Sequence, residues 1–94
     1  MKILLSLQAQ QELDDAISYY DLQKENLGNE FKSLIDNSIR NIQASPLLYP
    51  IIKEPIHRVV TRRFPYSIFY MIDNSEDIIV ILSIAHQHRK PFYT

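Results

Sequence analysis

Two strongly apolar runs lie close together in the second half of the chain, Tyr66 to Ile72 and Ile78 to His86. Both are rich in β-branched and aromatic residues, and a polar segment of five residues separates them. This pattern is typical of antiparallel strands joined by a hairpin. The run from Ile56 to Arg63 has the same character, so we predict three sequential strands. Because Ile78 to Ala85 contains only one polar residue, Ser83, it predicts a central strand covered on both faces.

The first half of the chain begins with a short strand candidate, Met1 to Leu5, followed by Ser6, a residue type that caps helix N-termini. Apolar residues then recur at helical spacing and predict a core-facing stripe. The stripe consists of Ala9, Leu13, Ala16, Ile17 and Tyr20. The polar residues between them are expected on a solvated, acidic back of the helix. They are Gln10, Gln11, Glu12, Asp14, Asp15 and Ser18.

A second helix is predicted to follow the only glycine, Gly28, where a helical hairpin would need a residue that tolerates positive φ. Its apolar face is formed by Phe31, Leu34, Ile35, Ser38, Ile39 and Ile42. Ser45-Pro46 ends it, because the residue before proline avoids the α region. The proline-flanked segment Leu47 to Pro55 predicts an extended connector outside the ladder. The expected fold is α+β, in the order β-α-α-β-β-β, with the helical hairpin packed on a small, mainly antiparallel twisted sheet.

Composition limits both the size of the fold and the class of function. A chain of 94 residues predicts one domain, 1–94. The absence of cysteine excludes disulfides and thiolate zinc sites. The net charge of −1 argues against a generic polyanion binder. The charge is unevenly distributed: residues 1–45 hold four basic and seven acidic residues, net −3. Residues 46–94 hold six basic and four acidic residues, net +2. The apolar N-terminal run is too short for a signal peptide or a membrane span, so we expect a cytoplasmic protein.

Several short sequence segments together resemble the RelE/ParE superfamily of bacterial toxins over essentially the whole chain. They are Glu12-Leu13-Asp-Asp-Ala16, Tyr19-Tyr20, Leu27-Gly28-Asn-Glu-Phe31, Ser45-Pro46, Arg62-Arg-Phe64-Pro65-Tyr66-Ser-Ile68-Phe-Tyr70 and His86-Gln-His-Arg89-Lys-Pro91-Phe-Tyr93. The resemblance implies the toxin of a type II toxin–antitoxin module. It is closer to the ParE branch, because the Phe64-Pro65-Tyr66 strand segment and the ending from His86 to Tyr93 are similar to that branch.

Two activities are implied within this superfamily, gyrase inhibition by ParE-like members and ribosome-dependent mRNA cleavage by RelE-like members. The ribonuclease alternative needs a base, arginines and an acid around one phosphate. Its candidate catalytic residues here are Arg62, Arg63, His86, His88, Arg89 and Tyr93. The near-neutral charge is a poor match to a protein that docks on ribosomal RNA, so we favour a non-enzymatic gyrase inhibitor. Its expected target-binding residues are Arg62, Arg63, His86, His88, Arg89, Lys90, Phe92 and Tyr93. A degenerate, inactive toxin that retains antitoxin binding is a third hypothesis.

Each candidate also has a structural alternative. Arg62 and Arg63 are strand neighbours that would point to opposite faces, as a surface arginine and a partner for a helix carboxylate. His57 is expected to pack its ring in the core. His86 and His88 have metal-compatible spacing but no third ligand, so no metal or other cofactor is predicted. The aromatic side chains Tyr66, Phe69 and Tyr70 are expected to pack across strands. The segment Pro91-Phe92-Tyr93 is expected either to hold the terminus against the sheet or to contact the target.

A cognate antitoxin is the expected constitutive partner. Six tyrosines and four phenylalanines exceed what so small a chain can bury, which predicts an apolar patch along the hairpin or a sheet edge. An antitoxin segment would cover it as a helix and an added strand. DNA gyrase, or alternatively the ribosome with its mRNA, is the expected target. We expect no membrane association and no sequence-specific DNA binding by the toxin alone.

Overall fold

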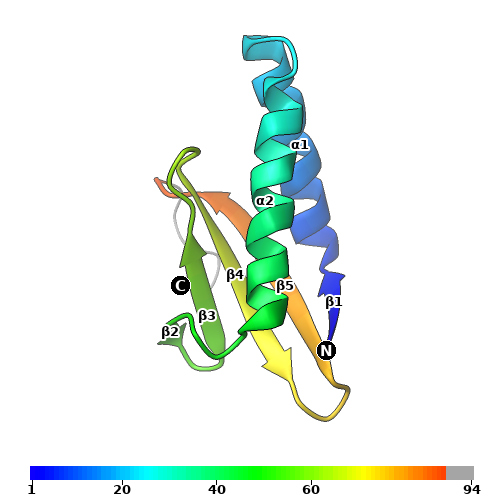
Figure 1. Ribbon diagram of the computed structural model, residues 1–94, viewed down its shortest axis with the longest axis vertical. Coiled ribbons are helices and arrows are strands. Elements are labelled where there is room, and N and C mark those ends of the chain that lie inside the picture. The colour runs from blue at the N-terminus through cyan, green and yellow to red at the C-terminus, as the bar shows by residue number, and fades with distance from the viewer. Residues whose placement is uncertain (89–94) are drawn as a thin grey trace.

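The computed structural model describes residues 1–88, and Figure 1 shows two long helices lying side by side over one face of a twisted sheet. The elements are β1 (Lys2–Leu5), α1 (Leu7–Gln23), α2 (Leu27–Ala44), β2 (Ile51–Lys53), β3 (Ile56–Val60), β4 (Tyr66–Asp73) and β5 (Ile78–His86). The predicted α+β class and the helical hairpin on a mainly antiparallel sheet are confirmed. The predicted order lacked one strand, β2.

Helix α1 begins as predicted. The Ser6 hydroxyl accepts a hydrogen bond from the backbone N–H of Ala9 at 3.0 Å, which satisfies one of the amides that the first helical turn leaves without a partner. Ala9, Leu13 and Ala16 are buried against the sheet, whereas Ile17 and Tyr20 are half-buried at the edge of the same core cluster. The predicted apolar stripe is therefore confirmed.

The turn between the helices differs from the prediction in one respect. The residue with positive φ is Asn26, at φ 67°, whereas Gly28 lies within the first turn of α2 and has no positive φ. A Cβ on Gly28 would stand 2.5 Å from both the backbone oxygen of Ile17 and the Oδ1 atom of Asp21. Glycine is needed there because the two helices approach closely, not because the chain reverses there.

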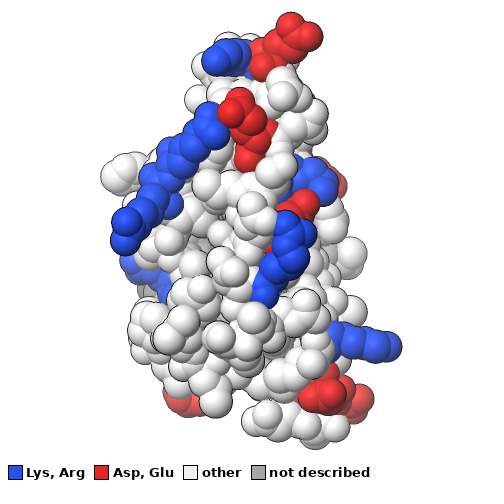
Figure 2. All heavy atoms as spheres, in the orientation of Figure 1, with Lys and Arg blue, Asp and Glu red and all other residues white. Residues whose placement is uncertain are grey.

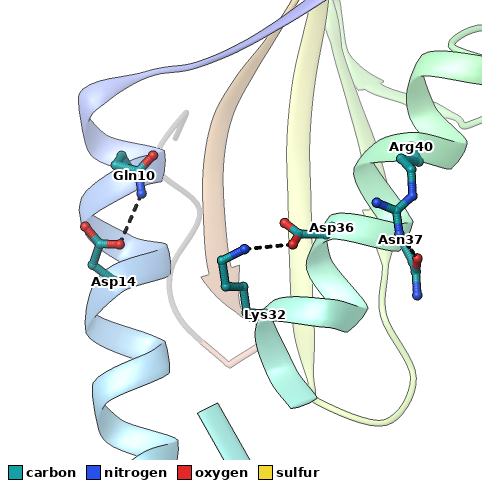
Figure 3. Close-up of polar contacts among 6 residues, drawn as sticks. All are labelled: Gln10, Asp14, Lys32, Asp36, Asn37 and Arg40. Carbon is teal, nitrogen blue, oxygen red and sulfur yellow. Dashed lines mark hydrogen bonds and ion pairs between the residues drawn. The ribbon is translucent and has the colours of Figure 1, made fainter. Parts of the chain in front are cut away.

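Helix α2 buries Phe31, Ile35 and Ile42 and ends at Ala44, directly before Ser45-Pro46 as predicted. An exposed i,i+4 pair, Lys32 Nζ to Asp36 Oδ2 at 2.9 Å, lies on its outer surface (Figure 3). A pair in this position contributes only about 0.3–0.5 kcal/mol. The helix is therefore held mainly by its apolar face.

The connector prediction for Leu47 to Pro55 was wrong over three residues, because β2 (Ile51–Lys53) pairs antiparallel with β3. Proline is tolerated at strand ends and on edge strands, and Pro50 and Pro55 flank β2 without interrupting it. The sheet order is β1-β5-β4-β3-β2, so β2 forms one edge. The β1–β5 pair is parallel and the other pairs are antiparallel.

Strand β3 ends at Val60 rather than at Arg63. Pro65 has no N–H to continue a ladder, and the chain closes a tight loop in which the Thr61 amide donates to the Tyr66 carbonyl at 2.9 Å. The Thr61 hydroxyl also donates to the Phe64 carbonyl. Residues 61–65 therefore connect β3 to β4 outside the strands.

Strand β5 lies inside the sheet, between β1 and β4. Its side chains Ile79, Ile81 and Ile84 are fully buried in the core shared with the helices. On the opposite face Ser83 and Ala85 are buried, whereas Val80 is only partly buried. The prediction that both faces are covered is therefore confirmed for the second half of the strand and only in part for the first. The helices cover one face only (Figure 1), and the apolar run reflects the burial of a single face together with partial cover on the other.

Candidate functional site

A cleft of about 460 Å³ opens between α1 and the adjoining ends of β4 and β5. Five lining residues come from one face of α1 and three come from the sheet. The lining residues are Glu12, Asp15, Ala16, Tyr19, Tyr20, Tyr66, Ile84 and His86. The charged side chains among these described residues are both carboxylates, so the described lining contributes negative charge beside a histidine.

Sequence reasoning missed the α1 side of this cleft, because it assigned Glu12 and Asp15 to the solvated back of the helix. Glu12 is half-buried, and its Oε1 atom accepts hydrogen bonds from the Ser83 hydroxyl at 2.8 Å and from the Ile84 N–H at 3.0 Å. Asp15 is exposed at the cleft and accepts from Gln11 Nε2 at 2.9 Å. The available signal was spacing, since cleft residues 12, 15, 16 and 19 share one helical face.

Aromatic rings form the floor of the cleft. Tyr20 contacts Phe31, Phe64 and Tyr66, with ring centroids 5.2, 4.8 and 6.2 Å away. Burial raises the pKa of Tyr20, a hydrogen bond from Tyr66 opposes this shift, and the charge of Tyr19 adds to it. The predicted packing role of Tyr66 is confirmed, and the raised pKa keeps the Tyr20 hydroxyl protonated, as a donor, at neutral pH.

His86 is the predicted site residue that the structure places in the cleft. Its ring stands edge-on to Tyr66 at 5.4 Å between centroids and lies 5.2 Å from the ring of His88. The Nδ1 atom of His86 accepts from the His88 backbone N–H at 3.2 Å, which leaves the proton of the neutral ring on Nε2. His88 is exposed. Within residues 1–88, no three histidine or acidic side chains are grouped to hold a metal ion.

The two arginines lie in the loop after β3, not on a strand as predicted. Arg63 forms an ion pair with Glu30 of α2 at 2.8 Å, and its guanidinium lies 5.1 Å from the centre of the Phe64 ring. The structural alternative of an arginine that pairs with a helix carboxylate thus describes Arg63. Arg62 is exposed. Four further predicted residues, Arg89, Lys90, Phe92 and Tyr93, lie outside the described residues.

His57 is a packed core residue, as predicted. Its ring stacks on Tyr70 with centroids 4.8 Å apart and an interplanar angle of 9°. The Nδ1 atom lies 2.8 Å from the Tyr49 carbonyl oxygen, and the Tyr70 hydroxyl donates to the Pro46 carbonyl at 2.6 Å. These contacts tie the segment after α2 to the sheet, and they hold His57 out of the cleft.

A second surface feature is apolar. Large hydrophobic side chains remain exposed in the segment after α2 and on β2, with Leu47 at 81%, Leu48 at 73% and Ile51 at 50%. Figure 2 shows this region, over the end of α2 and its connection to β2, as a largely uncharged part of the surface. Exposed apolar residues grouped at a sheet edge are typical of an interaction surface.

Comparison with known proteins agrees with this architecture. A family model described as the ParE toxin of the type II toxin–antitoxin system parDE matches residues 3–91. A search of curated proteins found no match. No helix within residues 1–88 combines the length and apolar character that a membrane span requires.

Solved structures of toxin–antitoxin systems share the fold. A chain of the chromosomal ParDE system from P. aeruginosa has a TM-score of 0.80 at 17% identity, covering 92% of this chain and 95% of that one. A chain of the E. coli RelBE complex has a TM-score of 0.68 at 12% identity, covering 94% of this chain and 98% of that one. The RelBE2 complex of Mycobacterium tuberculosis gives 0.61 at 18%, with coverages of 90% and 95%. On the evidence of the family model and the shared fold, the chain belongs to the ParE toxin family of type II toxin–antitoxin systems.

Proposed function

We propose that this toxin inhibits DNA gyrase by binding to it and that a cognate antitoxin neutralises it in the cytoplasm. The observation that carries the proposal is the charge around His86. Cleavage of RNA at this histidine would place a phosphate beside the cleft, where Glu12 and Asp15 supply negative charge. A phosphate would be repelled there instead of stabilised.

The arginines support the same conclusion. A ribonuclease needs cationic groups directed at the developing negative charge. Arg63 is instead engaged with Glu30 and Phe64, and neither Arg62 nor Arg63 is among the described residues that line the cleft. The overall charge of −1 also disfavours docking on ribosomal RNA. A binding toxin requires none of these phosphate contacts, so it is the function that fits.

The antitoxin is proposed to cover the apolar surface formed by Leu47, Leu48, Ile51 and Ile52. Three of these side chains are at least half exposed, and Ile52 is 36% exposed. Strand β2 is the outermost strand on its side of the sheet, so an extended antitoxin segment can add a strand there while its apolar side chains cover the patch. The structures that share the fold are toxin–antitoxin systems, which supports an antitoxin partner.

Expression of the chain alone is expected to stop growth, and coexpression of the antitoxin to restore it. Healthy growth with high levels of the folded protein alone would contradict this. Such growth would favour the degenerate, inactive toxin.

Substitution of single residues separates binding from catalysis. Because a binding surface shares its energy among several contacts, His86→Ala and His88→Ala should each cause a graded loss of inhibition in a gyrase supercoiling assay. A general acid or base would instead contribute about 10²–10⁴-fold. Complete loss of activity in a folded His86→Ala protein that still binds its target would favour the ribonuclease.

Arg62 can be tested against a matched arginine on α2. Arg62→Gln should weaken inhibition through slower association, because an exposed cation mainly raises the encounter rate. Arg40 is also exposed, and it donates to Asn37 on the outer face of α2 (Figure 3). Arg40→Gln should leave inhibition unchanged. Equal effects of the two substitutions would show that only net charge matters and that the Arg62 loop is not at the target interface.

A further inference from the structure

A bulge in β5 determines which side chains face the helices. Up to the bulge, Ile79 and Ile81 occupy the helix-facing positions. The register then shifts by one residue at Leu82, and Ile84 and His86 take the same face. Because side chains alternate along a strand, a regular β5 would place His86 on the opposite face, away from the cleft. The position of His86 in the cleft therefore depends on the bulge.

Where its parallel pairing with β1 ends, β5 is contacted by Ser6, the N-cap residue of α1. Leu5, the last residue of β1, pairs with Ile81, and the Ser6 N–H donates to the Ile81 carbonyl at 2.9 Å. Among the described residues, no strand lies beside this edge of β5 beyond that point. The Ser6 hydroxyl then donates to the Leu82 carbonyl at 2.9 Å. The bulged residue is thus held by the helix cap.

Glu12 holds the next two residues of β5. Its Oε1 atom accepts from the Ser83 hydroxyl and from the Ile84 N–H, the first two positions after the bulge. A carboxylate that accepts a backbone N–H replaces the carbonyl that a neighbouring strand would supply. The contact spans 72 positions in the sequence and ties α1 to the part of β5 that leads to His86.

We propose that Glu12 is a positioning residue that fixes the bulge and thereby directs His86 into the cleft beside Tyr66. This inference rests on the proposed function in one respect, namely that His86 belongs to the target-binding face. Glu12 acts through the backbone of β5, and the Glu12 carboxylate need not touch the target.

Nuclear magnetic resonance on the full-length labelled chain, made by cell-free synthesis, tests the structural part. In Glu12→Ala, exchange of the Ile84 amide proton should accelerate about tenfold or more, and the nuclear Overhauser effect between the His86 and Tyr66 rings should weaken. Glu12→Gln keeps an oxygen acceptor and should restore both signals. Unchanged Ile84 exchange and an unchanged ring contact in Glu12→Ala would overturn the proposal.

The matched control is Asp14→Ala, which removes an exposed carboxylate two residues away that accepts from Gln10 at 3.1 Å (Figure 3). It should change neither signal. If Glu12→Ala does not fold, amide exchange in the wild-type chain tests the proposal instead. The proposal requires the Ile84 amide to be protected like that of Ile79 within the ladder, and rapid exchange at Ile84 would overturn it.

A double-mutant cycle tests whether Glu12 acts through His86. Inhibition of gyrase supercoiling is measured for Glu12→Ala, His86→Ala and the double variant. If Glu12 only positions His86, the double variant should be no weaker than His86→Ala. Additive losses would overturn the proposal. Absence of any inhibition by the wild type would refute the proposed function alone, because the magnetic resonance measurements still decide the role of Glu12.

Discussion

Substitution of Gly28 by alanine has two effects of known size on stability, and they oppose each other. Alanine favours a helical position over glycine by about 1 kcal/mol, and Gly28 has no positive φ that alanine would strain. The added Cβ, however, would lie 2.5 Å from the Ile17 carbonyl oxygen and from Asp21 Oδ1. Asp21 can rotate away at the loss of its 2.8 Å bond to the Gly28 N–H, but the Ile17 carbonyl moves only with α1.

The magnitude follows from the required movement. Ordinary contacts of a Cβ begin at 3.4 Å. Because protein interiors are closely packed and leave no spare room, the helices would have to separate locally by about 0.9 Å. Overpacking of this kind costs about 1–3 kcal/mol, and the lost hydrogen bond adds about 1 kcal/mol. After the gain in helix propensity, the net loss is about 1–3 kcal/mol, which lowers the Tm of a domain of this size by about 5–15 °C.

Thermal and urea unfolding of the purified chain measure this loss. The control is Asn26→Gly at the residue that does have positive φ, 67°. Because glycine accepts this conformation without strain, the control should be neutral or slightly stabilising. A Gly28→Ala protein as stable as the wild type, or more stable, would refute the claim that close helix approach requires this glycine.

Three further predictions concern polar contacts. Tyr70→Phe removes the donor to the Pro46 carbonyl and should lower the free energy of unfolding by about 1–2 kcal/mol in urea denaturation. Burial raises the pKa of Tyr70 from 10.0 to about 12. The stabilisation by the Tyr70 hydroxyl should therefore be complete below pH 10 and disappear as the pH rises through 12. Alkaline unfolding at the same pH in Tyr70→Phe as in the wild type would contradict this. Hydrogen bonds from the Ser75 hydroxyl and nearby amides lower the pKa of Asp73. The stabilisation of the fold by the Asp73 carboxylate should therefore be present above pH 3.8 and lost as the pH falls through the folded-state pKa. An NMR titration midpoint for Asp73 at or above 3.8 would refute this. Arg63→Gln breaks an exposed ion pair and should change stability by less than about 1 kcal/mol; a larger loss on urea unfolding would show that the Phe64 contact is structural.

Local sequence signals predicted the parts of the fold that local chemistry determines. Ser6 caps α1 through its own hydroxyl, and Ser45-Pro46 follows the last residue of α2. The role of Gly28 depends on a residue of the other helix. It was therefore assigned to the backbone turn, which Asn26 makes instead.

The site was only partly predictable for a similar reason. The sequence drew attention to His86, but its place beside Tyr66 depends on a one-residue shift of register in β5. No spacing rule marks that shift, because Leu82 fits an unbroken apolar strand equally well. Glu12 has the sequence context of a solvated helix residue, and only its contact with Ile84, 72 positions away, shows its structural role.

The central claim, inhibition of gyrase by binding, is tested most directly on one preparation of the purified toxin. Gyrase supercoiling is measured with and without the toxin, and mRNA cleavage is measured in a translating extract with the same preparation. The account predicts dose-dependent loss of supercoiling and intact mRNA. Intact supercoiling together with mRNA cut at ribosomes would contradict it.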